Sequence, residues 1–207
     1  MDEKVRVSLQ GFGQAELTEK KSVFIGYAKP VESEDEAIEF VKEIKKKHSD
    51  ARHNVYAYMI GDNIIRYSDD GEPQGTGGIP VLDVIRKSGF TDAVIVVTRY
   101  FGGILLGAGG LVRAYSAAAK LAVDEAKIVT YRTYKEFTLN LTYTDHGKIT
   151  TLLSAFNPIE DGIDYSDSVK LTLALPICKY DEFVSNVLEA TAGRAVFTEL
   201  GTRFDKQ

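Results

Sequence analysis

The residues best suited to chemistry lie near the middle of the chain, where acids, cations and glycines alternate. Three carboxylates, those of Asp69, Asp70 and Glu72, fall within one short turn, and two cations follow, Arg99 and Arg113. Paired carboxylates bind Mg²⁺ or exchange protons, and arginine pairs with carboxylates or phosphates. Two interpretations therefore stay open: a turn held by its own side chains, in which Arg99 pairs with one of these acids, and a binding site.

Clustered glycines accompany these charged residues. The candidate binding positions among them and beside them are Gly75, Thr76, Gly102, Gly103, Gly107, Gly109 and Gly110, with His53 just before a predicted strand. Glycine allows positive φ and close approach of backbone to a neighbour, and the start of a helix points free N–H groups outward. The simpler interpretation is a set of tight turns in an α/β sheet. The alternative is a face that binds an anion or a backbone phosphate.

Composition narrows the class of protein. The 207 residues carry a net charge of −5 and 44% are hydrophobic, which is typical of a globular protein and excludes a basic protein that coats nucleic acid. A single cysteine, Cys178, excludes an internal disulfide and favours a reducing compartment; we expect a small buried thiol there. The N-terminal residues are charged, and no apolar run is long enough to cross a bilayer. We therefore expect a cytoplasmic protein with no membrane partner and no sequence-specific binding to DNA.

The first part of the chain predicts a mixed α/β domain over residues 1–129. Ser33 followed by Glu36 is the pattern of a capping box, which predicts a helix from Ser33 to His48 whose last turn carries three lysines and His48. The other predicted elements are a possible strand at 5–9, one or two strands at 16–29, a hairpin at 54–60 and 64–67, a helix at 79–87, a buried strand at 92–100 and a helix at 109–127.

The second part, residues 130–207, predicts a different arrangement. Its expected order is strand 134–143, helix 145–156, strands 162–165 and 169–175, helix 179–192 and strand 195–200. This βαββαβ order is that of a ferredoxin-like domain. Clustered glycines are absent from it, and no group of residues in it indicates chemistry.

Standard catalytic signatures are missing from the whole sequence. There is no phosphate-binding P-loop, no nucleophile elbow and no zinc-protease or Cys-x-x-Cys motif. With three histidines and one cysteine, a zinc site of the usual type is not expected. The sequence thus predicts no metal and no cofactor, and it favours a non-enzymatic protein without excluding an enzyme.

A composite motif resembles that of the YigZ/IMPACT family. It comprises Ser68-Asp69-Asp70-Gly71-Glu72-Pro73, Gly75-Thr76, and Arg99 to Gly107 with the sequence RYFGGILLG, and it continues through Gly110 into the next helix. The resemblance covers most of residues 16–127, and the tail resembles the C-terminal domain of the bacterial two-domain members. One position departs from the pattern, since Ile79 stands before Pro80 where the family often has a basic residue.

The resemblance implies an α+β protein of two domains. The first is expected to be similar to ribosomal-protein domain 2 and to domain IV of elongation factor G, and the second, ferredoxin-like domain to domain V of that factor. It also implies a regulator of translation or of a stress response, because eukaryotic relatives are linked to translational control during amino-acid starvation. The ribosome, RNA or a translation-associated protein is the expected partner.

Two functional hypotheses follow. In the first, a non-enzymatic regulator binds the translation machinery, with Arg99 and Arg113 as phosphate contacts and the glycine loops allowing close approach. In the second, an enzyme or binding protein acts on a phosphorylated or peptide-like small molecule, using the glycine-rich loops together with Asp69, Glu72 and Arg99.

Overall fold

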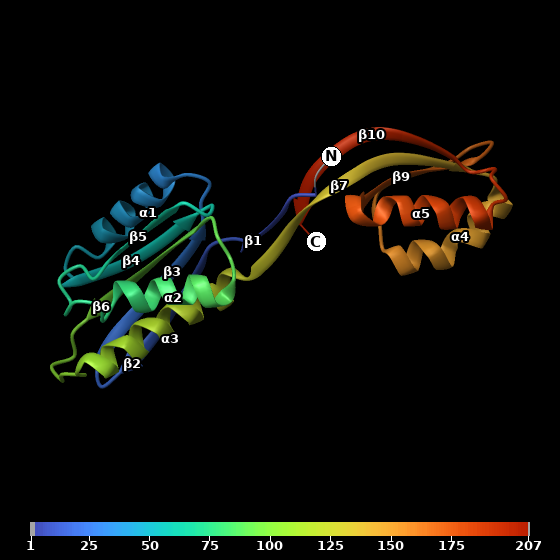
Figure 1. Ribbon diagram of the computed structural model, residues 1–207. Coiled ribbons are helices and arrows are strands. Elements are labelled where there is room, and N and C mark those ends of the chain that lie inside the picture. Colours follow the sequence, from blue (N-terminus) through green and yellow to red (C-terminus); the bar gives the residue numbers. More distant parts are fainter. Residues whose placement is uncertain (1–2, 207) are drawn as a thin grey trace. The chain divides into compact units, whose positions relative to one another are not determined.

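The structure is a computed structural model that describes residues 3–206 (Figure 1). The chain forms two compact units. One comprises residues 6–130, and the other comprises residues 131–206 together with residues 3–5. Each unit contains its own hydrophobic core. The predicted α+β class, with an α/β domain followed by a ferredoxin-like one, is confirmed.

The first unit is built on a five-stranded antiparallel sheet. Its spatial order is β2 (Gly13–Glu19), β3 (Ser22–Pro30), β6 (Ala93–Tyr100), β4 (His53–Ile60) and β5 (Ile64–Ser68). Helix α1 (Glu34–Lys47) packs on one face, and α2 (Gly78–Ser88) and α3 (Ala108–Ala126) pack on the other (Figure 1). The sheet is therefore the middle of three layers.

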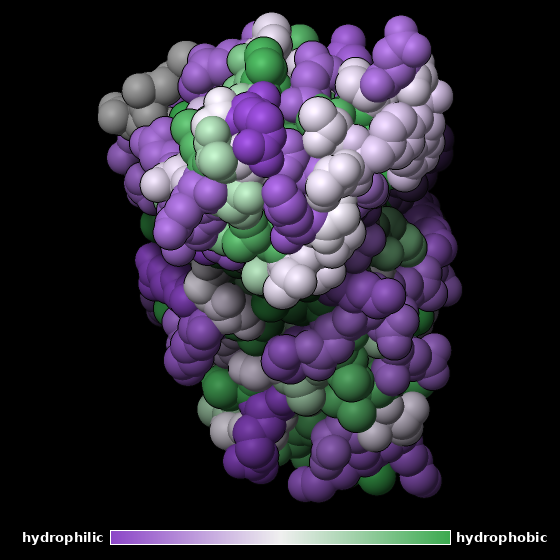
Figure 2. All heavy atoms as spheres, turned by 90° about the vertical axis from the view of Figure 1, so that its right-hand side faces the viewer, coloured by the Kyte–Doolittle hydropathy of each residue, from purple (hydrophilic) through white to green (hydrophobic). Residues whose placement is uncertain are grey.

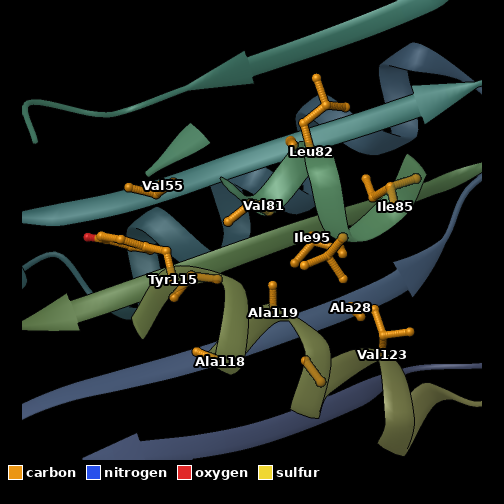
Figure 3. Close-up of a cluster of buried hydrophobic side chains, with 14 of the residues drawn as sticks. Ala28, Val55, Val81, Leu82, Ile85, Ile95, Tyr115, Ala118, Ala119 and Val123 are labelled. Atoms are coloured by element: carbon orange, nitrogen blue, oxygen red, sulfur yellow. The ribbon is translucent and has the colours of Figure 1, made fainter. Parts of the chain in front are cut away.

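The central strand β6 is buried on both faces, as its apolar sequence predicts. Ile95 and Val97 belong to the core under α2 and α3, whereas Val94 and Val96 belong to the core under α1. Because successive side chains of a strand point to opposite faces, one apolar run serves both cores. Figure 3 shows the first of these cores, with Ile95 between the side chains of the two helices.

Helix α1 begins with the cap that the sequence predicts, with one difference. The Ser33 hydroxyl accepts the N–H of Glu36 at 3.3 Å, but the Glu36 carboxylate accepts the N–H of Glu32 at 2.9 Å, one residue before the cap. The first turn holds three acids and the last turn three lysines, which suits the helix dipole at both ends. Its cap His48 closes the helix by donating its N–H to the carbonyl of Ile44 at 3.0 Å.

Helix α3 lies unusually close to the sheet because small residues line the contact. A Cβ atom added to Gly26 would sit 2.3 Å from the carbonyl oxygen of Ala118. Ala118 and Ala122 are fully buried at this contact. The alanine-rich sequence of the helix is therefore a packing feature.

The second unit has the ferredoxin-like order. It comprises β7 (Ile128–Leu141), α4 (Tyr143–Phe156), β8 (Ile159–Tyr165), β9 (Val169–Pro176), α5 (Ile177–Ala190) and β10 (Val196–Lys206). β7 is central, with β9 and then β8 on one side and β10 on the other, all antiparallel. Phe137, Leu171 and Phe183 are among the side chains that pack in its core.

Several details differ from the sequence predictions. β7 starts six residues earlier than expected and β10 continues to Lys206, because these strands pair with each other along their length. The possible strand at residues 5–9, by contrast, is present as β1 (Val5–Leu9) next to β7. The prediction of a buried Cys178 is wrong: it lies exposed in the first turn of α5.

Over the face drawn in Figure 2, hydrophobic and hydrophilic residues are interspersed. None of the helices in residues 3–206 is long and apolar enough to cross a membrane.

Candidate binding site at the end of strand β6

Asp69 uses its carboxylate to hold the first glycine cluster. It accepts the backbone N–H groups of Gly75 at 2.8 Å, Gly77 at 2.9 Å and Gly78 at 2.8 Å. Gly77 is the N-cap of α2 and offers no side chain, so Asp69 caps this helix from the preceding turn. These N–H groups, predicted as an anion site, are thus already bonded to an anion of the chain itself.

The same bonds set the ionisation of Asp69. Burial alone would raise the pKa of its carboxyl, but the three N–H donors outweigh burial and lower the pKa below its ordinary value. The hydroxyl of Thr76 donates to the carbonyl of Pro73 at 2.6 Å. Both side chains therefore stabilise the turn.

Asp70 joins this turn to α1 and β4. Its carboxylate accepts Nζ of Lys45 at 2.6 Å and the backbone N–H of Asn54 at 2.7 Å. Its carbonyl lies 2.8 Å from Nδ1 of His53, and because a carbonyl only accepts, that nitrogen carries the proton. His53 and Asp70 are thus neighbours that bond to each other.

Glu72 and Arg99 form a buried ion pair. The Nη1 atom of Arg99 donates to Oε1 of Glu72 at 2.6 Å, and the two side chains are 7% and 3% exposed. The hydroxyl of Tyr115 donates to the same oxygen at 2.7 Å. In Figure 3 the ring of Tyr115 lies in the hydrophobic core while its hydroxyl points away from the other labelled side chains. Burial, together with the charge and hydrogen bond of Glu72, raises the pKa of Tyr115 far above its usual value.

Aromatic rings and a serine complete the surroundings of Arg99. Its guanidinium lies 5.4 Å from the ring centres of both Phe24 and Phe101. Nη2 reaches the Ser22 hydroxyl at 3.5 Å, and this hydroxyl also accepts the N–H of Gly102 at 3.2 Å. Within the described residues Nε finds no partner. Arg99 is therefore buried, pairs with Glu72 and holds the loop after β6 in position.

Gly102 allows two loops to touch. A Cβ atom at this position would lie 2.0 Å from the carbonyl carbon of Lys21, so the turn between β2 and β3 packs directly on the loop after β6. Lys20 and Lys21 are both exposed in that turn. Two ammonium groups are thus carried by a turn that contacts the loop at Gly102.

The loop that follows Arg99 displays apolar side chains to solvent. Phe101 is 46%, Ile104 42% and Leu105 83% exposed, whereas Leu106 packs against the core. Exposed apolar residues that follow one another in a loop with fixed ends are a recurrent feature of interaction sites. We call Phe101, Ile104 and Leu105, together with Arg113, the β6–α3 surface.

The start of α3 adds positive character to the β6–α3 surface. Its N-cap is Gly107, which makes no side-chain hydrogen bond, and its first turn has no acid. Arg113 is exposed, and a Cβ atom at Gly109 would lie 3.6 Å from its Nη1. From Asp92 to Asp124 the sequence contains no other acidic residue. In a chain of charge −5, this stretch is locally positive.

The structure thus divides the predicted site in two. The first group belongs to internal hydrogen-bond networks and comprises Asp69, Asp70, Glu72, His53, Gly75, Thr76 and Arg99. The second group lies in the loop after β6 and at the start of α3, where Gly103, Gly107, Gly109 and Arg113 are exposed and Gly102 and Gly110 are half-buried. No group of three or more His, Cys, Asp or Glu side chains in residues 3–206 is placed to hold a metal ion. Sequence reasoning missed Tyr115 and the exposed apolar side chains of the β6–α3 surface. The signal that marks this surface in the sequence is the absence of acidic residues between Asp92 and Asp124.

A second hydrogen-bond network, which sequence reasoning also missed, lies on the face of the sheet that α1 covers. The Nε2 atom of His48 lies 2.6 Å from the hydroxyl of Tyr27, and its Nδ1 atom lies 2.8 Å from the hydroxyl of Tyr100. The Tyr100 hydroxyl donates in turn to the carboxylate of Asp50 at 3.0 Å. The pKa of His48 is lowered mainly by burial and also by the positive charge of nearby Lys47, whereas the negative charge of Asp50 acts to raise it. The network ties the end of α1 to the residue that precedes the loop.

Comparison with known proteins identifies the chain. Residues 20–123 match the Impact N-terminal domain, and residues 139–194 match a domain of unknown function, DUF1949. IMPACT family member YvyE of Bacillus subtilis is 38% identical over 189 residues, which are 90% of this chain and 87% of that protein. The chain belongs to the IMPACT family. IMPACT family member YigZ of Escherichia coli is 35% identical over 84% of this chain and 87% of its own length.

A more distant relative and a solved structure are also similar to this chain. Protein IMPACT of Rattus norvegicus is 27% identical over 54% of this chain and 37% of its own length. A crystal structure described as that of a hypothetical protein aligns over 95% of this chain and 97% of its own, with a TM-score of 0.60 and 32% identity. All the predicted site residues lie within the match to the Impact N-terminal domain.

Proposed function

We propose that this IMPACT family protein is a non-enzymatic regulator of translation or of a stress response, and that it binds the ribosome, RNA or a translation-associated protein. The observation that carries the proposal is the β6–α3 surface. Leu105 is 83% exposed at its tip, and Arg113 and the uncapped start of α3 lie beside it in a stretch without acids. Such a surface suits a partner that presents apolar groups next to phosphates or carboxylates.

The internal networks support binding rather than catalysis. The carboxylates and the arginine that resemble a catalytic cluster bond to one another and to backbone N–H groups, so they hold the loop in position. A binding surface on a loop gains affinity when its ends are fixed, because less conformational entropy is lost on association. Arg99 and Ser22 fix the loop at one end and α3 fixes it at the other.

A small-molecule function remains the second candidate. The exposed start of α3 and the neighbouring guanidinium of Arg113 present donors that suit a phosphorylated or peptide-like molecule. A thermal shift with inorganic phosphate, ATP and short peptides separates this candidate from the first. A rise in melting temperature with one of these probes, lost in Arg113→Glu, would favour it.

The test of the proposed function is co-sedimentation with ribosomes at low and high salt. Wild-type protein is compared with the two surface variants Leu105→Ser and Arg113→Glu. The control variant is Lys87→Glu, because the Lys87 side chain is also exposed but belongs to the last turn of α2 and not to the β6–α3 surface. We expect salt-sensitive association that both surface variants lose and the control retains. If wild-type protein stays at the top of the gradient at every salt concentration, the ribosomal partner is excluded.

A further inference from the structure

A recess lies between α1 and β4, on the face of the first unit's sheet that α1 covers. Its volume is about 220 Å³, and it is lined by Ile38, Val41, Lys42, Lys45, Tyr56 and Tyr58. The tyrosines alternate along β4, so both rings point toward α1, and they stack with centres 6.1 Å apart and planes at 9°. We call this recess the α1 groove.

Two ion pairs flank the α1 groove, one between α1 and β5 and the other between α1 and the turn that follows β5. Glu34 lies 3.4 Å from Arg66 near the start of the helix, and Lys45 lies 2.6 Å from Asp70 near its end. Glu34 also accepts the Tyr58 hydroxyl at 2.9 Å. Lys45 lies eleven positions after Glu34, which is about 16 Å along a helix. The groove is therefore a bounded site, open to solvent between its two ends.

The charges around the groove leave one cation uncompensated. Glu34 is matched by Arg66, and Lys45 by Asp70. Lys42 lines the groove, is exposed, and makes no ion pair within the described residues. An occupant should therefore bring one negative charge to the position of Lys42.

The size and walls of the groove point to a side chain as the occupant. Pockets for whole drug-sized ligands measure about 300–1,000 Å³, so this one suits a single large apolar group. Stacking of nucleic-acid bases is disfavoured, because Tyr58 is only 4% exposed and the Lys45 ammonium lies over the ring of Tyr56, 5.7 Å from its centre. Insertion of an apolar side chain between Ile38 and the tyrosine rings is favoured.

We propose that the α1 groove binds an acidic segment of a partner protein, which inserts one apolar side chain and places a carboxylate against Lys42. Apolar anchors in desolvated pockets supply much of the affinity of protein interfaces, and a neighbouring charge pair adds orientation. This site is separate from the β6–α3 surface, so the protein holds two partners or two parts of one partner.

The experiment uses a fluorescein-labelled decapeptide with one central phenylalanine flanked by glutamates, and measures its anisotropy on titration with the full chain. Matched probes replace the phenylalanine by serine or the glutamates by glutamine. The protein variants are Lys42→Glu and Ile38→Ser, with Lys46→Glu as the control because Lys46 is also exposed on α1 but does not line the groove. Ile38 is 37% exposed, so its substitution leaves the core in place.

We expect Lys42→Glu and Ile38→Ser each to weaken binding of the acidic phenylalanine peptide about tenfold or more, which corresponds to at least about 1.4 kcal/mol. Lys46→Glu should bind as the wild type does, because Lys46 does not line the groove. The proposal is overturned if wild-type protein does not bind the peptide, or if Lys46→Glu loses as much affinity as Lys42→Glu. Lys42-dependent binding of an oligouridine probe in place of the peptide would also overturn it.

Discussion

Arg99 and Glu72 are joined by a 2.6 Å hydrogen bond inside the first unit, where almost no water reaches either side chain. Arg99 ends the central strand β6, and Glu72 belongs to the turn before α2. Tyr115 brings α3 to the same carboxylate oxygen. One buried oxygen thus links a strand, a turn and a helix whose residues lie up to 43 positions apart.

Removing one member of this pair should destabilise the fold. Arg99→Ala leaves the Glu72 carboxylate buried without its cation, and such a change costs about 3–5 kcal/mol. The free energy of unfolding, measured with urea and circular dichroism, checks this. The control is Lys87→Ala, which removes an exposed pair with Asp83 and should cost less than about 1 kcal/mol. An Arg99→Ala protein of near wild-type stability that no longer binds ribosomes would show instead that Arg99 contacts the partner.

Tyr115→Phe isolates the second hydrogen bond to Glu72. The ring stays in the core while the carboxylate loses a donor, so we expect a loss of about 1.5–3 kcal/mol in unfolding free energy. Tyr143→Phe is the matched control, because the hydroxyl of Tyr143 donates to the carbonyl of Ser166 on an exposed surface. Equal effects of the two changes would contradict a special role for the buried network.

The helix-capping carboxylate of Asp69 should make stability depend on acid pH. Its pKa is lowered in the folded protein, where three N–H donors outweigh burial, so its contribution is present above the unfolded-state pKa of about 3.9. That contribution is lost as the pH falls below this value and through the lower folded-state pKa. Asp69→Asn removes the charge at every pH.

The test for Asp69 is the difference in unfolding free energy between the wild type and Asp69→Asn, followed from neutral pH to below pH 3. We expect the wild type to be more stable at neutral pH and the difference to shrink in acid. Asp145 in the second unit also has a lowered pKa, through its hydrogen bonds with Arg194 and Lys148, but it contributes equally to both proteins and cancels. A difference that is constant with pH would rule out the charge of Asp69 as the cause.

The sequence predicted most elements because their signals are local. The apolar run of β6 and the cap at Ser33 each reflect a rule that acts within a few residues, and both correspond to elements of the structure. Strand β10 was predicted too short, because its last residues are mostly exposed and are held by pairing with β7, in which Arg203 lies opposite Tyr134, 69 positions away. Pairing at that distance leaves no local signal.

The site was harder to predict than the fold. Asp69, Glu72 and Arg99 were selected for their chemical types, but which partner each one bonds depends on how β6, the turn and α3 meet. Sequence reasoning left open whether Arg99 meets a carboxylate or a ligand, and the 2.6 Å contact with Glu72 gives the answer. The exposure of Leu105 was not foreseen, because an apolar residue between glycines predicts a turn rather than a surface.

Gly26 tests the close packing of α3 on the sheet. Gly26→Ala would place a methyl group 2.3 Å from the carbonyl oxygen of Ala118, which is backbone and can yield only if the helix shifts. Overpacking of this kind costs about 1–3 kcal/mol, so the unfolding free energy should fall by that amount. The control is Gly11→Ala, where nothing lies within 4 Å of the new methyl group and little change is expected. Because α3 also carries Tyr115 and the exposed Arg113, a shifted helix should weaken ribosome co-sedimentation in Gly26→Ala but not in Gly11→Ala.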